Sequence, residues 1–527
     1  MPHSDLRIRE TNEIDRLAAT YICSEEPARP GHGPRHRVDI IPPSKGSSGS
    51  YLSSLLEVFL PVGYPHSVSE DYIDCHKAYI PKSRKYGDAE VILLSGDLSS
   101  APGTRLLVLI DPCGVENANL NACGLPPSSK GLLASRAVLQ GVGVGDSTAS
   151  PTAALLLSVF QDSMGRIATI LFAHRLGTSI EPECKMYRLA ADVFNDSAMI
   201  FDCMSPIFPK PLRVILLSLS SVLRALCGVA AGSAKASLSV HFARRANLGE
   251  LNAKDSSQET VISLLGMLVG SVVVSHISTP LATWITLLSL LSIHLATNYA
   301  AVRAVKMTTL NRQRANIVFS TLFNEGRALT PDQVSRRERI FERDGILRWK
   351  ASSTTYGSCQ IGAAMRDLFL SIGDSTSSGN YIRDIHVDIR TLIKIFEQEN
   401  YILWYNKESR RATIVLKAHA TPATQLKAWS HALIVSRLVS LESLLKQDGQ
   451  LVREKTQLIT QREKNANPEE GEGGAPTTML AILQRTLSSH SGNFSDWTVR
   501  LGSVGWDLNT PVLETRPGTR LEVERDD

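Results

Sequence analysis

Five charged residues on two neighbouring predicted helices are spaced as ion pairs. Asp162 and Arg166 stand four residues apart in one apolar segment, and Arg188 and Asp192 repeat that spacing in the next, with Lys185 one turn before them. Side chains at i and i+4 share one side of a helix, so opposite charges there can pair. In a bilayer such charges have to face the protein interior, where they mark a binding site or a solute path. The alternatives are a structural pair for Asp162–Arg166 and a solvated helix face for the other three.

Two further polar residues, Asn247 and Lys254, lie on one side of the segment that leads into the most apolar part of the chain. We include them in the same candidate polar site, again with a solvated helix face as the alternative. None of these residues has the spacing of metal ligands, and no HExxH or GxSxG motif occurs in the sequence. The sequence therefore predicts no catalytic residue and no metal site.

A glycine-rich turn over residues 141–147 is a candidate anion site. Gly143 and Gly145 suggest the dinucleotide fingerprint GxGxxG, but Asp146 stands where its third glycine would be needed. The glycines instead fit a tight turn or close helix packing, with Asp146 or Ser147 capping the helix that follows. We therefore expect no bound cofactor. An enzyme that binds an anionic or phosphorylated cofactor at this helix start stays open as the alternative.

The element that follows these residues is a stretch without charge. Residues 260–302 contain no Asp, Glu, Lys or Arg, and Pro280 divides them into the apolar runs Val261–Thr279 and Leu281–Tyr299. Each run has 19 residues, about 28 Å as a helix, against the ~30 Å hydrocarbon core of a bilayer. Basic residues flank the outer ends but not the turn, which predicts that both ends are cytosolic. The pattern indicates a helical hairpin in a membrane, with a buried hairpin of a soluble helical protein as the alternative.

Composition excludes several other classes. The net charge is +4 over 527 residues and aromatic residues make up 6%, so neither charge nor stacking groups point to nucleic acid. The eight cysteines are scattered without a CxxC pair, as in a reduced intracellular protein. The N-terminus is charged and lacks an apolar core, so no secretory signal peptide is predicted. We expect an integral protein of an intracellular membrane.

The predicted fold is mainly α, with a helical membrane-associated domain followed by a small α+β soluble domain. Strands at 401–405 and 412–417 and a helix at 421–447 belong to the second domain. The predicted order is a flexible arm (1–50), a short ordered segment with an irregular insertion (51–127, the insertion at 78–127), the helical membrane domain (128–320), the α+β domain (325–450), and a linker and tail (451–527).

Several long blocks resemble the root UVB-sensitive family, a family built on a domain of unknown function. They are FLPVGYPHSVSEDYIDCH, GVGVGDSTASPTAALLLSVFQDSMGRIATILFAHRLG, KMYRLAADVFNDSAMIFDCMSPIFP, HFARRANLGELNAKDSSQETVISLLGMLVG and NYAAVRAVKMTTLNRQR. The resemblance covers about residues 51–76 and 128–450. Family members pass almost directly from the first block to a serine-rich stretch, so residues 78–127 are an insertion relative to the family pattern.

The resemblance implies a membrane-associated protein without an established catalytic activity. Plant members are linked to root responses to UV-B, seedling development, auxin transport and vitamin B6 status. We therefore expect a non-enzymatic membrane scaffold or a protein that binds or transports a small molecule. The partners we expect are membrane lipid and a protein bound through residues 325–450, with a homo- or hetero-oligomer possible and no nucleic acid.

Overall fold

The chain folds into two compact units. The structure is a computed structural model that describes residues 6–12, 16–26, 35–43, 67, 151–244, 246–277, 279–350, 354–373, 381–385, 387–447 and 478–523. The helical unit comprises Tyr51–Val305, and the sheet unit joins Met1–Ser50 to Lys306–Asp527. The sheet unit is therefore discontinuous in sequence, with the helical unit inserted into it.

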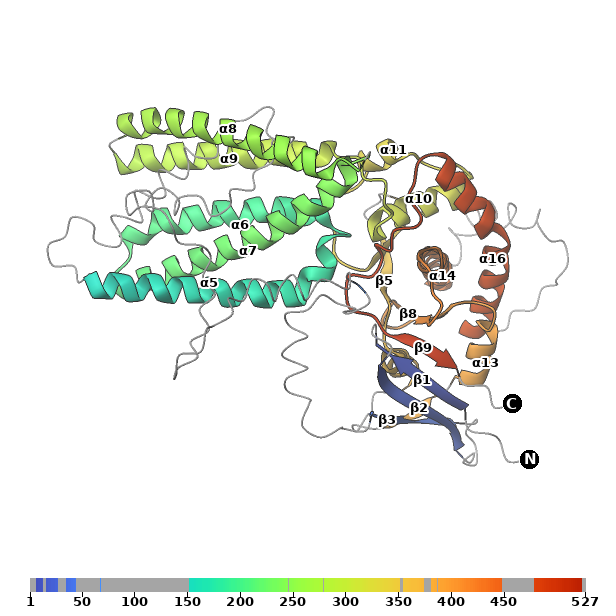
Figure 1. Ribbon diagram of the computed structural model, residues 1–527. Helices are drawn as coiled ribbons and strands as arrows, with labels where there is room; N and C mark the ends of the chain where they lie inside the picture. Colours follow the sequence, from blue (N-terminus) through green and yellow to red (C-terminus); the bar gives the residue numbers. More distant parts are fainter. Residues whose placement is uncertain are drawn as a thin grey trace, which may run out of the picture. The chain divides into compact units, whose positions relative to one another are not determined.

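The described part of the helical unit consists of long helices that run back and forth (Figure 1). They are α5 (Pro151–Ile180), α6 (Cys184–Met204), α7 (Lys210–Phe242), α8 (Leu248–His276) and α9 (Pro280–Ala304), with the short 3-10 helix η1 (Ser205–Ile207) after α6. Helix α7 packs against both α5 and α6, and α6 packs against α9. The prediction of a mainly α chain is confirmed.

The two apolar helices of the predicted hairpin are α8 and α9. Pro280 is in the first turn of α9, where its missing N–H would have no helical partner in any case. Thr279 caps the same helix, because its hydroxyl oxygen accepts a hydrogen bond from the Ala282 N–H at 3.3 Å. Proline and threonine thus separate two helices that would otherwise form one continuous apolar run, and the predicted helix–turn–helix is confirmed.

The surface of the helical unit is rich in large apolar side chains. Among the described helices, α7, α8 and α9 are long and apolar enough to cross a membrane. Helix α8 is the most exposed of the three, and its buried residues are Gly266 and Gly270. Leu268 of α8 is 60% exposed and Leu281 of α9 is 71% exposed. Water-soluble surfaces rarely present apolar side chains over such continuous lengths.

The sheet unit is built on one mixed sheet. Its described strands are β1 (Leu6–Thr11), β2 (Leu17–Glu26), β3 (Arg35–Ile41), β4 (Ile346–Arg348), β5 (Thr355–Ile361), β6 (Tyr381–Ile385), β7 (Tyr401–Asn406), β8 (Arg411–Lys417) and β9 (Arg520–Val523). Their order is β4-β5-β8-β9-β1-β2-β3-β6, with β7 also paired to β8. Strand β8 pairs antiparallel with β7 along one edge. Along its other edge it pairs parallel with β5 and, further along, with β9. The predicted hairpin of strands at 401–405 and 412–417 is confirmed by β7 and β8.

Helices cover this sheet and complete its core. They are α10 (Arg312–Glu325), α11 (Pro331–Ser335), α12 (Met365–Ile372), α13 (Ile389–Ile395), α14 (Pro422–Gln447) and α16 (Met479–Ser503). The predicted helix at 421–447 is confirmed as α14, and Thr421 accepts a hydrogen bond from the Thr424 N–H at 3.2 Å. Trp429 of α14 is fully buried and donates to Asn316 Oδ1 of α10 at 2.9 Å.

The prediction of a flexible arm for residues 1–50 is wrong over its described strands. β1, β2 and β3 form consecutive antiparallel neighbours, and β1 also pairs with β9 at the other end of the chain. Glu10 of β1 is 2% exposed and accepts hydrogen bonds from the Tyr21 hydroxyl (2.6 Å), the Met365 N–H (2.8 Å) and the Thr519 hydroxyl (2.7 Å). The polar composition of this segment predicts flexibility, but the backbone N–H and C=O groups of its strands form hydrogen bonds with strands that are distant in the sequence.

The predicted domain limits after the helical unit also change. The predicted membrane domain ends at residue 320, which lies inside helix α10. The whole of α10 belongs instead to the sheet unit, whose second segment begins at Lys306. The predicted tail contains α16, a 25-residue helix whose apolar side packs on α14, and the sheet strand β9. The α+β domain is therefore larger than residues 325–450, because its core needs segments from both ends of the chain.

Candidate functional site

One side of α6 carries a row of polar side chains that are buried within the helical unit. Positions 185, 188, 192 and 195 recur every third or fourth residue, and position 202 follows two turns after 195, a spacing that keeps residues on one helix side. We call this row the α6 seam. Its members, each no more than 7% exposed, are Lys185, Arg188, Asp192, Asn195, Asp196 and Asp202. Charged side chains are almost never buried unless they are paired, so the contacts of the seam determine its chemistry.

The first contact is an ion pair within α6. Arg188 Nη1 lies 2.8 Å from Asp192 Oδ1, and the two side chains are 2% and 4% exposed. Removing one partner of a buried pair costs about 3–5 kcal/mol, because the other charge is left without compensation. The alternative that Lys185, Arg188 and Asp192 form a solvated helix face is therefore wrong, since all three are buried.

The second contact joins the seam to α9. His294 Nδ1 lies 3.1 Å from Asp196 Oδ2, and His294 Nε2 lies 2.8 Å from Asn298 Nδ2. His294 and Asn298 are 7% and 2% exposed. An apolar cluster of Met199, Cys203, Leu287 and Leu291 packs at the following level of the same two helices. Later residues of α6 meet earlier residues of α9, so the two helices run antiparallel.

The third contact joins the seam to α7. Asp202 is 1% exposed and forms an ion pair with Arg224 of α7. One turn away, the Ser220 hydroxyl donates to the Ala198 carbonyl oxygen at 3.1 Å. The acidic groups of the seam thus pair with Arg188 on α6 itself, with His294 on α9 and with Arg224 on α7.

The other predicted members of the polar site do not join the seam. Asp162 and Arg166 are exposed on α5, and no ion pair between them occurs in the described structure. Asn247 is the exposed N-cap residue of α8, and its side chain makes no capping hydrogen bond. Lys254 is also exposed.

A separate charged cluster lies on the same stretch of α8 as Lys254. Lys235 of α7 pairs there with Asp255 at 2.9 Å and with Glu259 at 3.1 Å. The predicted anion site at Gly143, Gly145, Asp146 and Ser147 lies outside the described residues.

Sequence reasoning missed Asp202, Arg224, His294 and Asn298 as members of one polar group, and it did not include Asn195 and Asp196 in the candidate site. One signal for them exists in the sequence. In KMYRLAADVFNDSAMIFDC the polar residues repeat at helical spacing while the intervening positions are mostly apolar. That pattern also fits a helix whose polar side faces water. The polar side of α6 is identified as the inner side only because the neighbouring helices are apolar on their exterior.

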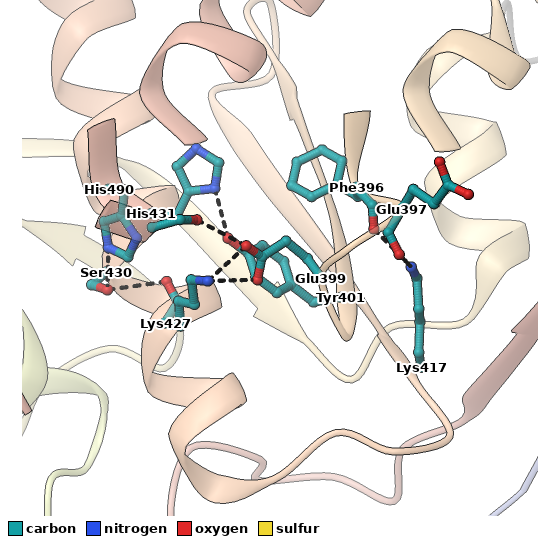
Figure 2. Close-up of polar contacts among 10 residues, drawn as sticks. Phe396, Glu397, Glu399, Tyr401, Lys417, Lys427, Ser430, His431 and His490 are labelled. Carbon is teal, nitrogen blue, oxygen red and sulfur yellow. Dashed lines mark hydrogen bonds and ion pairs between the residues drawn. The ribbon is translucent and has the colours of Figure 1, made fainter. Parts of the chain in front are cut away.

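A second buried polar cluster lies in the sheet unit, between α14, α16 and β7 (Figure 2). The rings of His431 and His490 stack with their centroids 5.5 Å apart. His490 Nε2 lies 2.8 Å from the Ser430 hydroxyl, and His431 bonds the Tyr401 hydroxyl at 3.0 Å and the Thr486 hydroxyl at 2.8 Å.

This cluster is closed to substrate. Ser430 and His490 have the distance of a nucleophile and its base, but they are 0% and 1% exposed. Burial and the nearby Lys427 ammonium lower the pKa of His490 to about 3. Lys427 itself is held by Glu399 at 2.6 Å (Figure 2). The cluster therefore acts as a polar part of the core.

Chemically, the α6 seam offers cationic, anionic and neutral hydrogen-bonding groups in one water-poor row. Such a row can bind a polar or zwitterionic solute, or pass protons between carboxylate and imidazole groups. No group of three or more His, Cys, Asp or Glu side chains that could hold a metal occurs among the described residues.

The fold defines a two-unit protein in which an apolar helical bundle with a buried charged seam is inserted into an α+β unit. Two family models match the chain in the same order. "Vitamin B6 photo-protection and homoeostasis domain" matches residues 125–326, and "Root UVB sensitive protein, C-terminal" matches residues 378–516. The chain belongs to the root UVB-sensitive family.

Named relatives show how far the similarity extends. The chain is 34% identical to RUS family member 1 of Dictyostelium discoideum over 308 residues, which is 58% of this chain and 50% of that protein. It is 29% identical to protein root UVB sensitive 3 of Arabidopsis thaliana over 333 residues, which is 62% of this chain and 72% of that protein. The chain thus spans half the length of the first relative. No solved structure matches the chain. Neither the names of these relatives nor the descriptions of the two models state an enzymatic activity.

Proposed function

We propose that this chain is an integral protein of an intracellular membrane, and that the α6 seam is the binding site or path of a small polar solute. The observation that carries the proposal is the burial of six polar residues of α6 inside a unit whose exterior helices are apolar. Ionisable residues in such a setting are rare, and those that occur line solute or proton pathways.

Stability alone gives a weak reason for the seam. A buried ion pair typically gains little over well-packed apolar residues, because desolvation offsets the attraction. A helix whose inner side held leucine at positions 188 and 192 would therefore fold as well. We infer that the charges are kept for an interaction with a solute, whose own polar groups replace part of the lost hydration.

The family description suggests which solutes to test first. The matched model over residues 125–326 is named for vitamin B6 homoeostasis. B6 vitamers carry a pyridine nitrogen that pairs with a carboxylate when protonated, and a phenolic oxygen that pairs with a guanidinium when ionised. The seam holds both kinds of partner in Asp192 and Arg188.

The test is uptake by the full-length protein in liposomes, with labelled pyridoxine and pyridoxal as probes. The test variant is the double substitution Arg188→Gln/Asp192→Asn, which removes both charges of this ion pair and so leaves neither partner unpaired. The matched control is Asp162→Asn/Arg166→Gln, the same chemical change at the same spacing on the exposed side of α5. We expect the seam variant to lose at least about ten-fold in uptake, and the control to keep it. Equal uptake by both variants, or no uptake by the wild type, would refute the seam as a B6 path.

Membrane integration has its own test. Alkaline carbonate removes peripheral proteins but leaves embedded helices in the membrane. We expect the full-length chain to stay in the membrane pellet. Release into the supernatant would mean that the apolar helices are covered by protein, and the proposal would fail at its first step.

A non-enzymatic scaffold is the second candidate, and the separate core of the sheet unit supports it. A scaffold needs only that the helical unit anchors the sheet unit, which would then bind a protein partner. Carbonate-resistant protein that shows no uptake would favour this candidate over transport.

A further inference from the structure

His294 is held between a carboxylate and a carboxamide in the interior of the helical unit. Its Nδ1 lies 3.1 Å from Asp196 Oδ2, and its Nε2 lies 2.8 Å from Asn298 Nδ2. None of the three residues is more than 7% exposed. The group lies on facing sides of α6 and α9, with Asp196 on the first helix and the other two residues on the second.

With the Asn298 carboxamide in this orientation, the contacts fit the neutral imidazole. A carboxylate accepts hydrogen bonds, so the proton of the ring is on Nδ1 and is donated to Asp196. The Asn298 Nδ2 group donates, so Nε2 accepts from it and carries no proton. In this arrangement a neutral imidazole in its Nδ1–H form has a partner at each nitrogen.

Asn298 carries an unused acceptor beside this ring. Its Oδ1 atom is buried and accepts no hydrogen bond from the described residues. Leaving such an atom without a donor is costly, and each example calls for an explanation. A half-turn of the carboxamide about its terminal bond exchanges nitrogen and oxygen. Oδ1 would then face Nε2, where it could accept a hydrogen bond from a protonated ring.

We propose that His294 is a proton-binding site of the α6 seam. A proton from the aqueous phase binds Nε2, the Asn298 carboxamide turns to accept the new N–H, and the imidazolium pairs with the Asp196 carboxylate. Release of the proton reverses these steps. The ligand of the site is the proton itself. That this proton accompanies a solute rests on the proposed function, whereas protonation of His294 does not.

The surrounding charges suit a site that changes charge. Asp196 is in contact with the ring. Further along the same side of α6 lie the paired Arg188 and Asp192 in one direction, and Asp202 with Arg224 of α7 in the other. On α9 itself, Arg303 is the single charged side chain. His276 of neighbouring α8 is exposed. The nearest charge is therefore the carboxylate that would stabilise an imidazolium.

The direct test is the nitrogen-15 spectrum of histidine-labelled, full-length protein in lipid bilayers, recorded between pH 5 and 8. Imidazolium and the two neutral forms have separate signals. His294→Gln identifies the His294 signal by its loss, and His276→Gln serves as the control that removes another histidine of the same unit. We expect the His294 signal to change from the Nδ1–H form to imidazolium as the pH falls. A signal that stays neutral over the whole range would overturn the proposal.

Two substitutions of Asn298 separate this role from simple packing. Asn298→Leu removes both the donor and the acceptor, so we expect a ring that stays neutral from pH 8 to pH 5. Asn298→Asp offers acceptors alone, so we expect a ring that stays charged over the same range. The two variants should thus be fixed in opposite states. If both titrate as the wild type does, the carboxamide has no part in proton binding, and the proposal is wrong.

A second measurement separates this inference from the proposed function. Pyridoxine uptake into liposomes is measured with and without an inward proton gradient, and we expect the gradient to raise wild-type uptake about five-fold or more but to leave His294→Gln unaffected. A titrating His294 with no uptake would keep the proton site and refute transport of pyridoxine. Uptake without any titration of His294 would support transport of pyridoxine and refute the proton site.

Discussion

Burial fixes the charge of two histidines in the sheet unit. His431 and His490 stack between α14 and α16 and are 0% and 1% exposed. Burial, together with the neighbouring ring and the Lys427 ammonium, holds the pKa of His431 well below its usual range. Burial and the Lys427 ammonium lower the pKa of His490 to about 3. Both rings are therefore neutral in the folded protein at every pH where the protein is expected to work.

This pair predicts a loss of stability in mild acid. The folded-state pKa of each histidine is lower than the unfolded value of about 6.5, so the unfolded chain binds more protons below that pH. The stabilising effect is complete above pH 6.5 and is lost as the pH falls towards the folded-state pKa, about 3 for His490. Each histidine should lower the free energy of unfolding by up to about 1.4 kcal/mol per pH unit in that window. Urea unfolding followed by tryptophan fluorescence reports it, because five of the six tryptophans lie after residue 305.

Substitution at His490 tests the origin of this pH dependence. Between pH 6.5 and 4.5, His490→Gln should reduce the slope of the unfolding free energy against pH by the contribution of one bound proton. This holds even if the substitution also changes the stability at pH 7. His419→Gln is the control, because it makes the same chemical change at an exposed histidine of the same unit. Identical slopes in wild type and His490→Gln would show that another group takes up the proton.

At the scale of elements, α5 and α7 approach closely because of one glycine. A Cβ atom at Gly165 would meet Ser221 Oγ at 3.3 Å and Ala225 Cβ at 3.5 Å. The Ser221 hydroxyl also donates to the Gln161 carbonyl oxygen across the same interface at 3.0 Å. Small residues at such crossings let helix backbones approach each other. Gly165 is therefore a packing residue, although it lies between the two charged residues that drew attention in the sequence.

Gly165→Leu should separate α5 from α7. We expect a loss of about 1–3 kcal/mol from overpacking. For a unit of this size, each kcal/mol lowers the unfolding temperature by roughly 2–4 °C. Thermal unfolding of the full-length protein in detergent measures the change. Gly177→Leu is the matched control on the same helix, because Gly177 is exposed and has nothing within 4 Å of its Cβ position. An equal loss in both variants would mean that leucine acts through the helix itself.

Local signals made several elements predictable. Pro280 and Thr279 mark the start of α9, and the alternating strands around a polar turn mark β7 and β8. The inner side of α6 was not predictable in the same way, because Asp192 and Asp196 at helical spacing fit a solvated face equally well. Whether these residues face water or the protein interior depends on the helices packed around α6, and the local sequence of α6 carries no information about those helices.

At the scale of the whole molecule, the sheet unit is assembled from both ends of the chain. Strand β1 pairs with β2 and with β9, and β3 pairs with β6. No sequence pattern near residue 10 indicates a partner near residue 522. For this reason the N-terminal strands and the role of the last segment could not be predicted from local composition.

This assembly predicts which fragments fold. Residues 306–527 alone lack β1, β2 and β3, so β6 would lose its neighbour β3 and β9 would keep only β8. The Met365 N–H and the Thr519 hydroxyl would also lose their acceptor, the Glu10 carboxylate. We expect that fragment to unfold without a cooperative transition. Residues 1–50 joined to 306–527 by a flexible Gly/Ser linker should give one cooperative transition in circular dichroism. Equal melting of the two fragments would show that the N-terminal strands contribute nothing to the core.

The neighbouring positions of β1 and β9 also restrict how the chain can be threaded through a membrane. Both ends of the helical unit return to one folded sheet. A chain that crosses a bilayer an odd number of times finishes on the face opposite to its start. The ~30 Å hydrocarbon core would then separate the two strands, and the sheet could not form. If the helical unit is embedded, its crossings are therefore even in number. If α7, α8 and α9 all cross the membrane, the segment between residues 51 and 305 must therefore contain at least one further crossing.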